Sequence, residues 1–444
     1  MDGNIVTRNF SALVDDRVGD GVFRVERSVY TDAAVFEAEM ERIYEKGWVY
    51  LCHESQVPEA GSYFACEIGY QPVLVIRQKD STLKAFINAC SHRGALLTAT
   101  KQGQATTLTC RFHGWSYGCD GHCIRIKAEK EGFPEEGFER SQYDLTGVAR
   151  LESYRGFVFG SLNPDVEPIA DYLAAAAGWI DLLVDQSPEG LEVVPGSSTY
   201  TIRGNWKMQV ENSVDGHHVS TVHRVFAATV SNREQRDGTQ GLAQTEGGRL
   251  TGKVPSGAYD LGNGHMSIWA QHTTPERRPI WQKKAWLEET YSAAKVEWIL
   301  ERGRNLAVFP NVMIMDNPST QIRVVKPISV DRAEVTVYCI APIGESAEAR
   351  SARLRKFEDF YLTTGMATSD DMAALEDTQA GSHARAVRWN DFGRGIGNMI
   401  HGPDEIAKAI GLNPVSSNPS WENETLFFGF YRKWRDMMAG ADGH

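Results

Sequence analysis

The stretch NACSHRGALLTATKQGQATTLTCRFHGWSYG, residues 88–118, pairs a cysteine with a histidine twice. Cys90 stands two residues before His92, and Cys110 stands three residues before His113. Thiolate sulfur and imidazole nitrogen are both ligands of transition metals. Each of the two short segments therefore offers one ligand of each kind, and together they could hold one metal centre.

The order of these ligands separates two kinds of metal site. A zinc finger usually presents its two cysteines first and its two histidines later, whereas here the two types alternate. In a Rieske [2Fe-2S] centre, two cysteines hold one iron and two histidines hold the other. The order favours a Rieske cluster that relays single electrons, and a structural zinc site is the alternative. Gly94 and Gly114 in the two segments let backbone amides approach the cluster sulfurs.

A second group of metal-binding residue types lies further along the chain. Asp215, His218 and His223 supply one carboxylate and two imidazoles in a short segment. Neutral imidazoles and one carboxylate with open positions suit a non-haem Fe(II) centre. The two histidines are five residues apart, which is roughly 140° around an ideal helix. We therefore expect a break, a π-bulge or a tight bend between them, so that both rings reach one metal.

The first motif sits inside a β-rich module. Short apolar runs between turn residues predict strands at residues 63–68, 73–77 and 83–87. The triplet Asn163-Pro164-Asp165 is a turn signal and marks the end of the module. Upstream, the helical period of residues 31–47 predicts a helix with Thr31 as its N-cap and Gly47 as its stop.

The remainder of the chain mixes both kinds of element. Strands are predicted at residues 198–202, 312–315, 321–325 and 334–340. An interrupted helix is expected over residues 211–223, and a longer one over residues 346–364, stopped by Gly365. Residues 228–264 are polar and glycine-rich with little periodicity, so we expect a lid there.

Composition excludes several classes of protein. The chain has 444 residues, 42% of them hydrophobic, which is enough for two or three packed domains. Its formal charge of −12 argues against binding to nucleic acid or to anionic membranes. The longest apolar run, residues 172–180, is far short of the roughly 20 residues of a membrane span. Nothing at the N-terminus suggests export, so a cytoplasmic location is expected. The cysteines other than Cys90 and Cys110 are expected to be reduced thiols.

The motif CSH and CRFHGW resembles the Rieske domain of aromatic-ring hydroxylating oxygenases. Rieske proteins of respiratory complexes carry a further disulfide-forming cysteine in each loop, where this chain has Ala95 and Phe112. The phrases GWVYLCHESQVP, NACSHRGA, GNWKMQVEN, GHHVSTVH and GMATSDD are similar to large subunits of the benzoate, toluate, anthranilate and aniline dioxygenase group. The resemblance extends from about residue 23 to residue 377.

This resemblance implies an α+β fold. A small all-β Rieske domain at residues 46–165 would be inserted into an α+β catalytic domain with a curved antiparallel sheet flanked by helices, of the helix-grip type. Residues 1–45 would form the N-terminal helical part of that catalytic domain, and residues 166–444 the rest.

The resemblance also implies the roles of individual residues. Cys90, His92, Cys110 and His113 would hold the [2Fe-2S] cluster. His218 and His223 would hold the mononuclear Fe(II), although His217 stands where tyrosine is common in the family.

The third ligand of this iron would be an acid after the long helix. By the same resemblance it is Asp371, with Asp370, Glu376 and Asp377 as competing candidates. Asp215 would be catalytic, accepting hydrogen bonds from His113 of one subunit and His218 of the next in a head-to-tail trimer. An N-cap or a surface acid is the alternative for Asp215.

The implied function is that of a terminal oxygenase large subunit. It would catalyse NADH-dependent cis-dihydroxylation of a small monocyclic aromatic compound, resembling benzoate, anthranilate or aniline, with O2. A flavin and [2Fe-2S] reductase would supply electrons, and a small β subunit would complete an α3β3 assembly. The alternatives are a Rieske monooxygenase that hydroxylates or demethylates a similar substrate, and an electron carrier without catalysis.

The substrate pocket is predicted less sharply. By proximity or resemblance, its lining residues are Val210, Asn212, Ser213, Asn305 and Phe309. Benzoate would need a buried cation in this pocket, whereas aniline would need hydrogen-bond acceptors. The sequence offers no basis for choosing an arginine, because Arg304 and Arg323 could equally form ion pairs in the scaffold.

Overall fold

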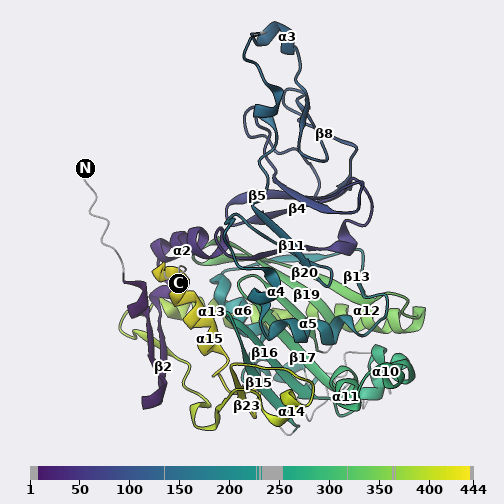
Figure 1. The fold of residues 1–444 in the computed structure, drawn as a ribbon. Helices are drawn as coiled ribbons and strands as arrows, with labels where there is room; N and C mark the ends of the chain where they lie inside the picture. The colour runs from purple at the N-terminus through teal and green to yellow at the C-terminus, as the bar shows by residue number, and fades with distance from the viewer. Residues whose placement is uncertain are drawn as a thin grey trace. The chain divides into compact units, whose positions relative to one another are not determined.

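A computed structural model describes residues 9–134, 136–226, 228–229, 232, 254–317, 319–362, 365 and 367–440 (Figure 1). The chain forms two compact units. One is continuous and comprises Tyr44–Ile169, and the other combines Met1–Ile43 with Ala170–His444. The smaller unit is thus an insertion in the larger one, and its limits lie a few residues from the predicted limits at residues 46 and 165.

The smaller unit is built from three antiparallel sheets. Their strand orders are β6-β5-β4-β7, β10-β9-β8 and β11-β12-β3. The strands are β3 Val49–His53, β4 Ser62–Ile68, β5 Gln71–Arg77, β6 Leu83–Ile87, β7 Gln102–Gln104, β8 Thr107–Thr109, β9 Ser116–Gly118, β10 Cys123–Arg125, β11 Arg150–Tyr154 and β12 Phe157–Ser161. One short helix, α3 (Glu129–Gly132), accompanies them. The three strands predicted from the sequence are confirmed as β4, β5 and β6.

A ten-stranded sheet dominates the larger unit. Its order is β13-β20-β19-β18-β17-β16-β15-β23-β22, with β14 also paired to β20. The strands are β13 Leu191–Val193, β14 Ser198–Ile202, β15 Ser256–Gly262, β16 His265–Gln271, β17 Arg302–Val308, β18 Val312–Asp316, β19 Thr320–Ser329, β20 Arg332–Pro342, β22 Ile400–His401 and β23 Ser416–Asn418. A separate three-stranded sheet joins β1 (Val14–Arg17), β2 (Val22–Glu26) and β21 (Trp389–Asp391).

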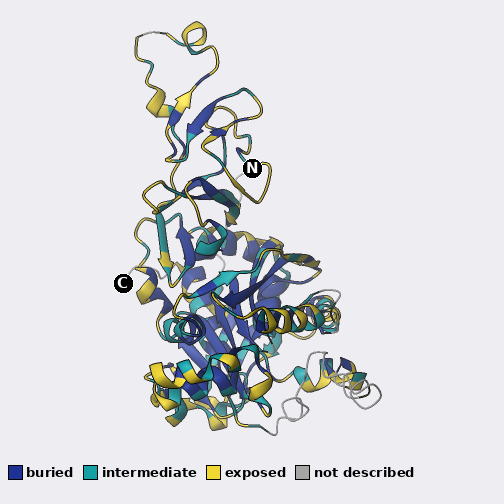
Figure 2. Cartoon of the chain, turned by 90° about the vertical axis from the view of Figure 1, so that its right-hand side faces the viewer, coloured by how far each residue is buried: buried dark blue, intermediate teal, exposed yellow. Residues whose placement is uncertain are grey.

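The helices of the larger unit accompany this sheet. They are α1 Ser28–Thr31, α2 Ala33–Glu39, α4 Ile169–Leu173, α5 Ala176–Val184, α6 Trp206–Ser213, α7 Val219–Val222, α10 Lys284–Thr290, α11 Ala293–Glu301, α12 Ala347–Tyr361, α13 Thr368–Ser382, α14 Glu405–Lys408 and α15 Phe427–Ala439. Figure 2 shows the strands between them as buried, and every residue of β17 and β18 is buried.

Helices cover both faces of the large sheet. Residues paired across antiparallel strands share a face, so Asn305 of β17 and its partner Met315 of β18 point the same way. Asn305 Nδ2 donates to Ser213 O of α6 at 3.0 Å, which places α6 on this face, called the inner face below. Arg302 points to the opposite, outer face, where its guanidinium lies 4.6 Å from the Trp298 ring of α11. The predicted α+β class, an antiparallel sheet flanked by helices with an inserted all-β unit, is confirmed.

The first predicted helix begins one residue later than expected and is divided. Asp32, not Thr31, caps α2, because its carboxylate accepts a hydrogen bond from the Ala34 N–H at 2.8 Å. A short α1 precedes the cap, and a wider π-helical turn, Met40–Tyr44, follows α2. The carboxylate at the adjacent position thus has the role assigned to Thr31, whose hydroxyl donates to Arg27 O at 3.3 Å.

The predicted lid is wrong where the structure describes it. Residues 256–262 form β15, which is hydrogen-bonded between β16 and β23 and buried at its five central positions. Both faces of this strand are covered, so its sequence lacks the alternation that marks a half-exposed strand. Residues 233–253 of the predicted lid lie outside the described residues. Within the described part of the chain, no helix is both long and apolar enough to cross a lipid bilayer.

Two candidate metal centres

The two Cys–His segments fold into turns with the same backbone hydrogen bonds. Cys90 O accepts from the Gly94 N–H at 2.8 Å, and Cys110 O accepts from the Gly114 N–H at 2.9 Å. Each cysteine N–H donates to the carbonyl of the fifth residue after it, at 2.9 and 2.7 Å. The glycines have φ values of +74° and +77°, where a side chain would be strained. The two segments are therefore matching loops that each depend on a glycine.

The cysteine side of this site is buried and the histidine side is open. Cys90 and Cys110 are 3% and 2% exposed, whereas His92 is exposed and His113 is half-buried. The two imidazole centroids lie 4.5 Å apart. A cluster held by these four residues is shielded from water by the core of the smaller unit and can exchange electrons with a partner through its imidazoles.

Two aromatic side chains support the site. Tyr117 Oη accepts a hydrogen bond from the Ser91 N–H at 3.1 Å and lies 3.2 Å from Cys90 Sγ. Burial, and then the neighbouring Cys90, raise the pKa of Tyr117, so its hydroxyl keeps its proton and is available as a donor to a cysteine thiolate. The Trp115 ring stacks on His92, with centroids 4.7 Å apart and planes 8° apart. The sequence motif contains both aromatic residues, but their roles were not predicted.

The spacing of the four Cys and His ligands does not match that around a single zinc ion. Four ligands about a single zinc ion lie within roughly 4 Å of one another, because Zn–S and Zn–N bonds are short. Among the described residues, only His218, His223 and Asp371 form a group of three with ligand atoms within 4.8 Å of one another. In the two Cys–His loops, which both lie in the described part of the chain, no three ligand atoms are this close to one another. This is expected where the four ligands are divided between two irons.

The second centre brings three predicted ligands together in the larger unit. Asp371 Oδ1 lies 3.4 Å from His218 Nε2 and 3.2 Å from His223 Nε2. His223 and Asp371 are buried, and His218 is half-buried. Two imidazoles and one carboxylate that meet in this way leave other coordination positions free. This is the ligand set of non-haem Fe(II) enzymes that react with O2.

The backbone around the two histidines differs from the prediction. α6 ends at Ser213, and α7 is a single regular turn with His218 and His223 at its two ends. The expected break between these histidines is therefore wrong. The irregular segment precedes His218 instead, and it contains Gly216, where an added Cβ would lie 2.4 Å from Trp421 O. A single turn is short enough for two long imidazole side chains to reach Asp371 from its two ends, with their centroids 5.2 Å apart.

Asp215 orients one of these histidines within the same chain. Its Oδ2 lies 3.2 Å from His218 Nδ1, and its Oδ1 accepts from the His217 N–H at 2.6 Å. Burial raises the pKa of Asp215, but the hydrogen bond and charge of His218 outweigh burial and lower it. Asp215 is thus an ionised, half-buried carboxylate whose two oxygens face His218 and the His217 N–H.

The acids near the long helices occupy different environments. Asp371 lies in the first turn of α13 and is the one that reaches the histidines. Glu376 instead accepts hydrogen bonds from Arg203, and Asp377 is exposed. Asp370 is half-buried and belongs to no three-ligand group among the described residues. The structure therefore favours Asp371 over its competitors.

Asn212 is the predicted pocket residue nearest to the ligands. Its Nδ2 lies 3.3 Å from Asp371 Oδ1 and 3.4 Å from His218 Nε2. The Ser213 hydroxyl donates a hydrogen bond to Gln209 O at 2.8 Å, so it is engaged within α6.

The other predicted pocket residues are more dispersed. Val210 is fully buried in α6. Asn305 lies on the inner face against α6. Phe309 packs in an aromatic cluster, with its centroid 5.3 Å from Phe430 and 6.4 Å from Trp206. Their contribution to substrate binding stays a prediction.

A buried ion pair beneath α6 was not predicted. Lys207 Nζ lies 2.6 Å from Glu39 Oε1, and both side chains are fully buried. Glu39 also accepts from the indole N–H groups of Trp206 at 2.8 Å and Trp434 at 2.6 Å. The residues come from three distant parts of the sequence, so no local pattern marks them. They anchor the helix that leads to Asp215.

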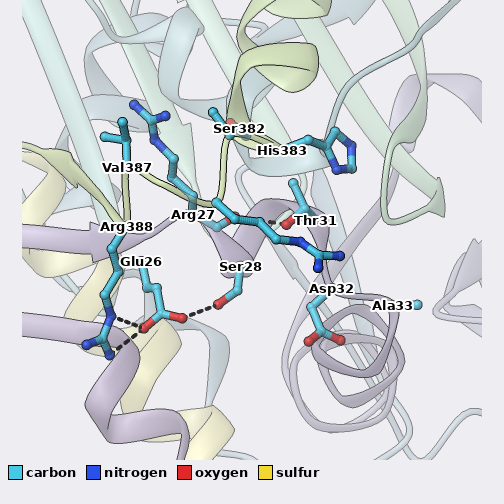
Figure 3. A pocket seen from close by; sticks show the side chains of 12 residues that line it. Glu26, Arg27, Ser28, Thr31, Asp32, Ala33, Ser382, His383, Val387 and Arg388 are labelled. Atoms are coloured by element: carbon cyan, nitrogen blue, oxygen red, sulfur yellow. Dashed lines mark hydrogen bonds and ion pairs between the residues drawn. The ribbon is translucent and has the colours of Figure 1, made fainter.

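A surface cavity of about 530 Å³ lies away from these ligands, between α1 and the end of α13 (Figure 3). Arg388 donates to Glu26 at 2.8 Å, and Ser28 Oγ donates to the same carboxylate at 2.9 Å. Arg27 Nε donates a hydrogen bond to Asn390 Oδ1 at 2.9 Å. Of the charged residues that line the cavity, Glu26 and Arg388 form an ion pair, and none of the predicted metal ligands lines it.

Comparison with known proteins agrees with this geometry. A family model described as the ring hydroxylating alpha subunit (catalytic domain) matches residues 191–440, and a Rieske [2Fe-2S] domain model matches residues 47–154. The toluate 1,2-dioxygenase subunit alpha of Pseudomonas putida is 42% identical, over 97% of this chain and 94% of its own length. The 2-halobenzoate 1,2-dioxygenase large subunit of Burkholderia cepacia is also 42% identical, over 96% and 92%.

A solved structure shows the same fold. The naphthalene 1,2-dioxygenase of Rhodococcus sp., with indole bound, superposes with a TM-score of 0.84 over 100% of both chains at 23% sequence identity.

Proposed function

This chain belongs to the ring-hydroxylating oxygenase α-subunit family, and on that premise we propose that it is the terminal oxygenase of an electron-transfer system. Its Rieske [2Fe-2S] domain and catalytic iron domain are those predicted from the sequence. In the proposed reaction, both atoms of O2 become hydroxyl groups on adjacent carbons of a small aromatic ring. NADH supplies two electrons, and one further proton completes the balance.

The convergence of His218, His223 and Asp371 within 4.8 Å is the observation that carries this proposal. These three residues would hold the mononuclear iron, and Cys90, Cys110, His92 and His113 would hold the cluster. When bound, the cluster supplies single electrons and the mononuclear Fe(II) activates O2. The chain itself fixes the imidazoles, through Asp215 on His218, and keeps Asp371 buried and ionised.

The substrate we propose is a small monocyclic aromatic acid. The two relatives named above act, by their names, on toluate and 2-halobenzoate, each a benzene ring that carries a carboxylate. An aniline-like ring without a carboxylate is the second possibility that follows from the sequence. Turnover of benzoate and aniline by the same preparation distinguishes the two.

We further propose the partners that such a subunit requires. The relatives are a subunit alpha and a large subunit, so they work with other components. A small β subunit would complete an α3β3 assembly, and a reductase with flavin and [2Fe-2S] would pass on electrons from NADH. Asp215 would accept a hydrogen bond from His113 of the neighbouring chain, because His113 is partly exposed and Asp215 already contacts His218. A cytoplasmic location stays a prediction from the sequence.

The test is analysis of metals and products of the assembled enzyme. We expect about three irons and two acid-labile sulfides per chain, no zinc, and NADH-dependent formation of a diol from benzoate. Zinc in place of iron, or a colourless protein, would contradict the proposal. An intact cluster without turnover of any ring in the presence of a reductase would favour the electron-carrier alternative.

A further inference from the structure

Arg323 lies on the inner face of the large sheet. In β19, it pairs with Met313 of β18 and with Val337 of β20. Gln321, two residues earlier in the same strand, pairs with Met315, the neighbour of Asn305. Paired residues and alternate residues share a face, so Arg323 points to the same side as Asn305, which contacts α6.

Arg304, the other arginine that the sequence could not exclude, lies on the outer face. It pairs with Trp269 of β16, and its Nη2 forms a buried ion pair with Asp316 Oδ2 at 2.5 Å. Arg278 Nη2 meets the same oxygen at 2.8 Å. Arg304 is thus part of the scaffold behind the sheet, and it cannot reach a substrate beside α6.

The charge of Arg323 is buried on the inner face. Burial raises the pKa of Tyr200 on the same face, and Arg323 opposes that rise. Arg323 is itself 3% exposed, so its charge is screened little by water. A permanent buried cation therefore stands on the face of the sheet that contacts α6.

The same face also carries polar atoms that lack a partner. Gln321 Oε1 and Asn305 Oδ1 are buried and have no hydrogen-bond partner among the described residues. Their neighbours on this face include the apolar side chains of Met313, Met315 and Val337. Unsatisfied buried polar atoms are rare in native proteins and are explained by a bound molecule or water. The apolar wall and the buried cation suit a flat ring that carries an acidic substituent.

We propose that Arg323 binds the carboxylate of the aromatic acid substrate and makes the enzyme select acids over uncharged rings. This inference rests on the proposed function and assigns its substrate class to one residue. A guanidinium matches a carboxylate with two parallel hydrogen bonds, and the pairing is strong when water is excluded. The ring would then lie against the apolar part of the inner face, beside α6.

The test compares Arg323→Gln with the unchanged protein on two ligands of the same shape, benzoate and its neutral analogue benzamide. In the assembled enzyme, we expect kcat/KM for benzoate to fall on the order of 100-fold, through KM, because a buried carboxylate loses its charged partner. The kcat/KM for benzamide should change by less than about threefold. Arg323→Lys should retain part of the preference, since it keeps the charge without the planar fork.

Control variants and a binding measurement make the result decisive. Arg332→Gln removes an exposed arginine from β20 and should leave the benzoate preference unchanged. Iron content and the cluster spectrum report whether Arg323→Gln is folded and loaded. Calorimetric binding of benzoate and benzamide gives the same comparison without turnover. If no diol forms from any ring, the proposed function is wrong. The calorimetric comparison of benzoate with benzamide then still tests whether Arg323 binds the carboxylate.

The outcomes are distinct. Loss of benzoate binding with benzamide binding retained supports the proposal. An equal loss for both ligands, no change for either, or the absence of any preference for benzoate in the unchanged protein overturns it.

Discussion

Asp215 Oδ2 lies 3.2 Å from His218 Nδ1, while His218 Nε2 faces Asp371 Oδ1 at 3.4 Å. The imidazole is thus held between two carboxylates, one on each ring nitrogen. A carboxylate on the outer nitrogen fixes the tautomer that leaves the other nitrogen free to bind a metal. The site therefore depends on Asp215 even though Asp215 is not itself a proposed ligand.

The first prediction concerns this contact. Asp215→Asn should reduce turnover by roughly 10- to 100-fold, because an amide orients the imidazole poorly and carries no charge. Asp215 is not one of the four proposed cluster ligands, so the cluster's iron and sulfide content should be unchanged. Turnover and the rate of cluster reoxidation by O2 with substrate measure the effect. Asp377→Asn removes an exposed acid and serves as the control. Equal activity of the two variants would show that Asp215 has no role.

The second prediction identifies the third iron ligand. Asp371→Ala should leave about two irons and two sulfides per chain, since only the mononuclear site loses a ligand. Asp370→Ala, one residue earlier, should keep about three irons. Iron and sulfide analysis of both variants gives the answer. Loss of iron from the Asp370 variant alone would reverse the assignment.

The third prediction concerns the tyrosine beside the cluster. Tyr117→Phe removes the hydroxyl 3.2 Å from Cys90 Sγ. A hydrogen bond to sulfur stabilises the more negative, reduced cluster. Its loss should lower the reduction potential by on the order of 40 mV, the one-electron equivalent of about 1 kcal/mol. Tyr143→Phe, in the same aromatic cluster, is the control, and spectroelectrochemical titration measures both. An unshifted potential for Tyr117→Phe would contradict this role.

The fourth prediction concerns pH and Asp260, which is 3% exposed. Burial raises its pKa from 3.8 to about 6, so the folded protein binds this proton more tightly than the unfolded chain. The bound proton contributes on the order of 3 kcal/mol to the free energy of unfolding. This contribution is complete below pH 3.8 and is lost as the pH rises through 6. Asp260→Asn should therefore flatten the pH dependence of the unfolding midpoint between these values. Parallel profiles for the two proteins would refute the assignment.

Local patterns in the sequence predicted much of the fold. The strands at residues 63–68 and 73–77 have clear turn residues at their ends, and the Cys–His loops are marked by residues close together in sequence. The strand at residues 256–262 was missed because both its faces are buried, which removes the alternation on which strand prediction depends. Backbone hydrogen bonds to β16 and β23, distant in sequence, decide its structure.

The site required information that no local pattern contains. Asp371 was predicted by resemblance, and its contact with His223 depends on how α13 packs. Arg304 and Arg323 look alike in the sequence, because the face to which each points is set by the register of β17 and β19. The bend expected between the two histidines is wrong, because their side chains are long enough to reach Asp371 from the two ends of one helical turn.

Labelled oxygen distinguishes dioxygenation from monooxygenation by this enzyme. The assembled enzyme, with reductase, NADH and benzoate, is supplied with 18O2, and the product is analysed by mass spectrometry. The proposed reaction yields a cis-diol in which both hydroxyl oxygen atoms are labelled. A product with one labelled atom would contradict dioxygenation and support a monooxygenase.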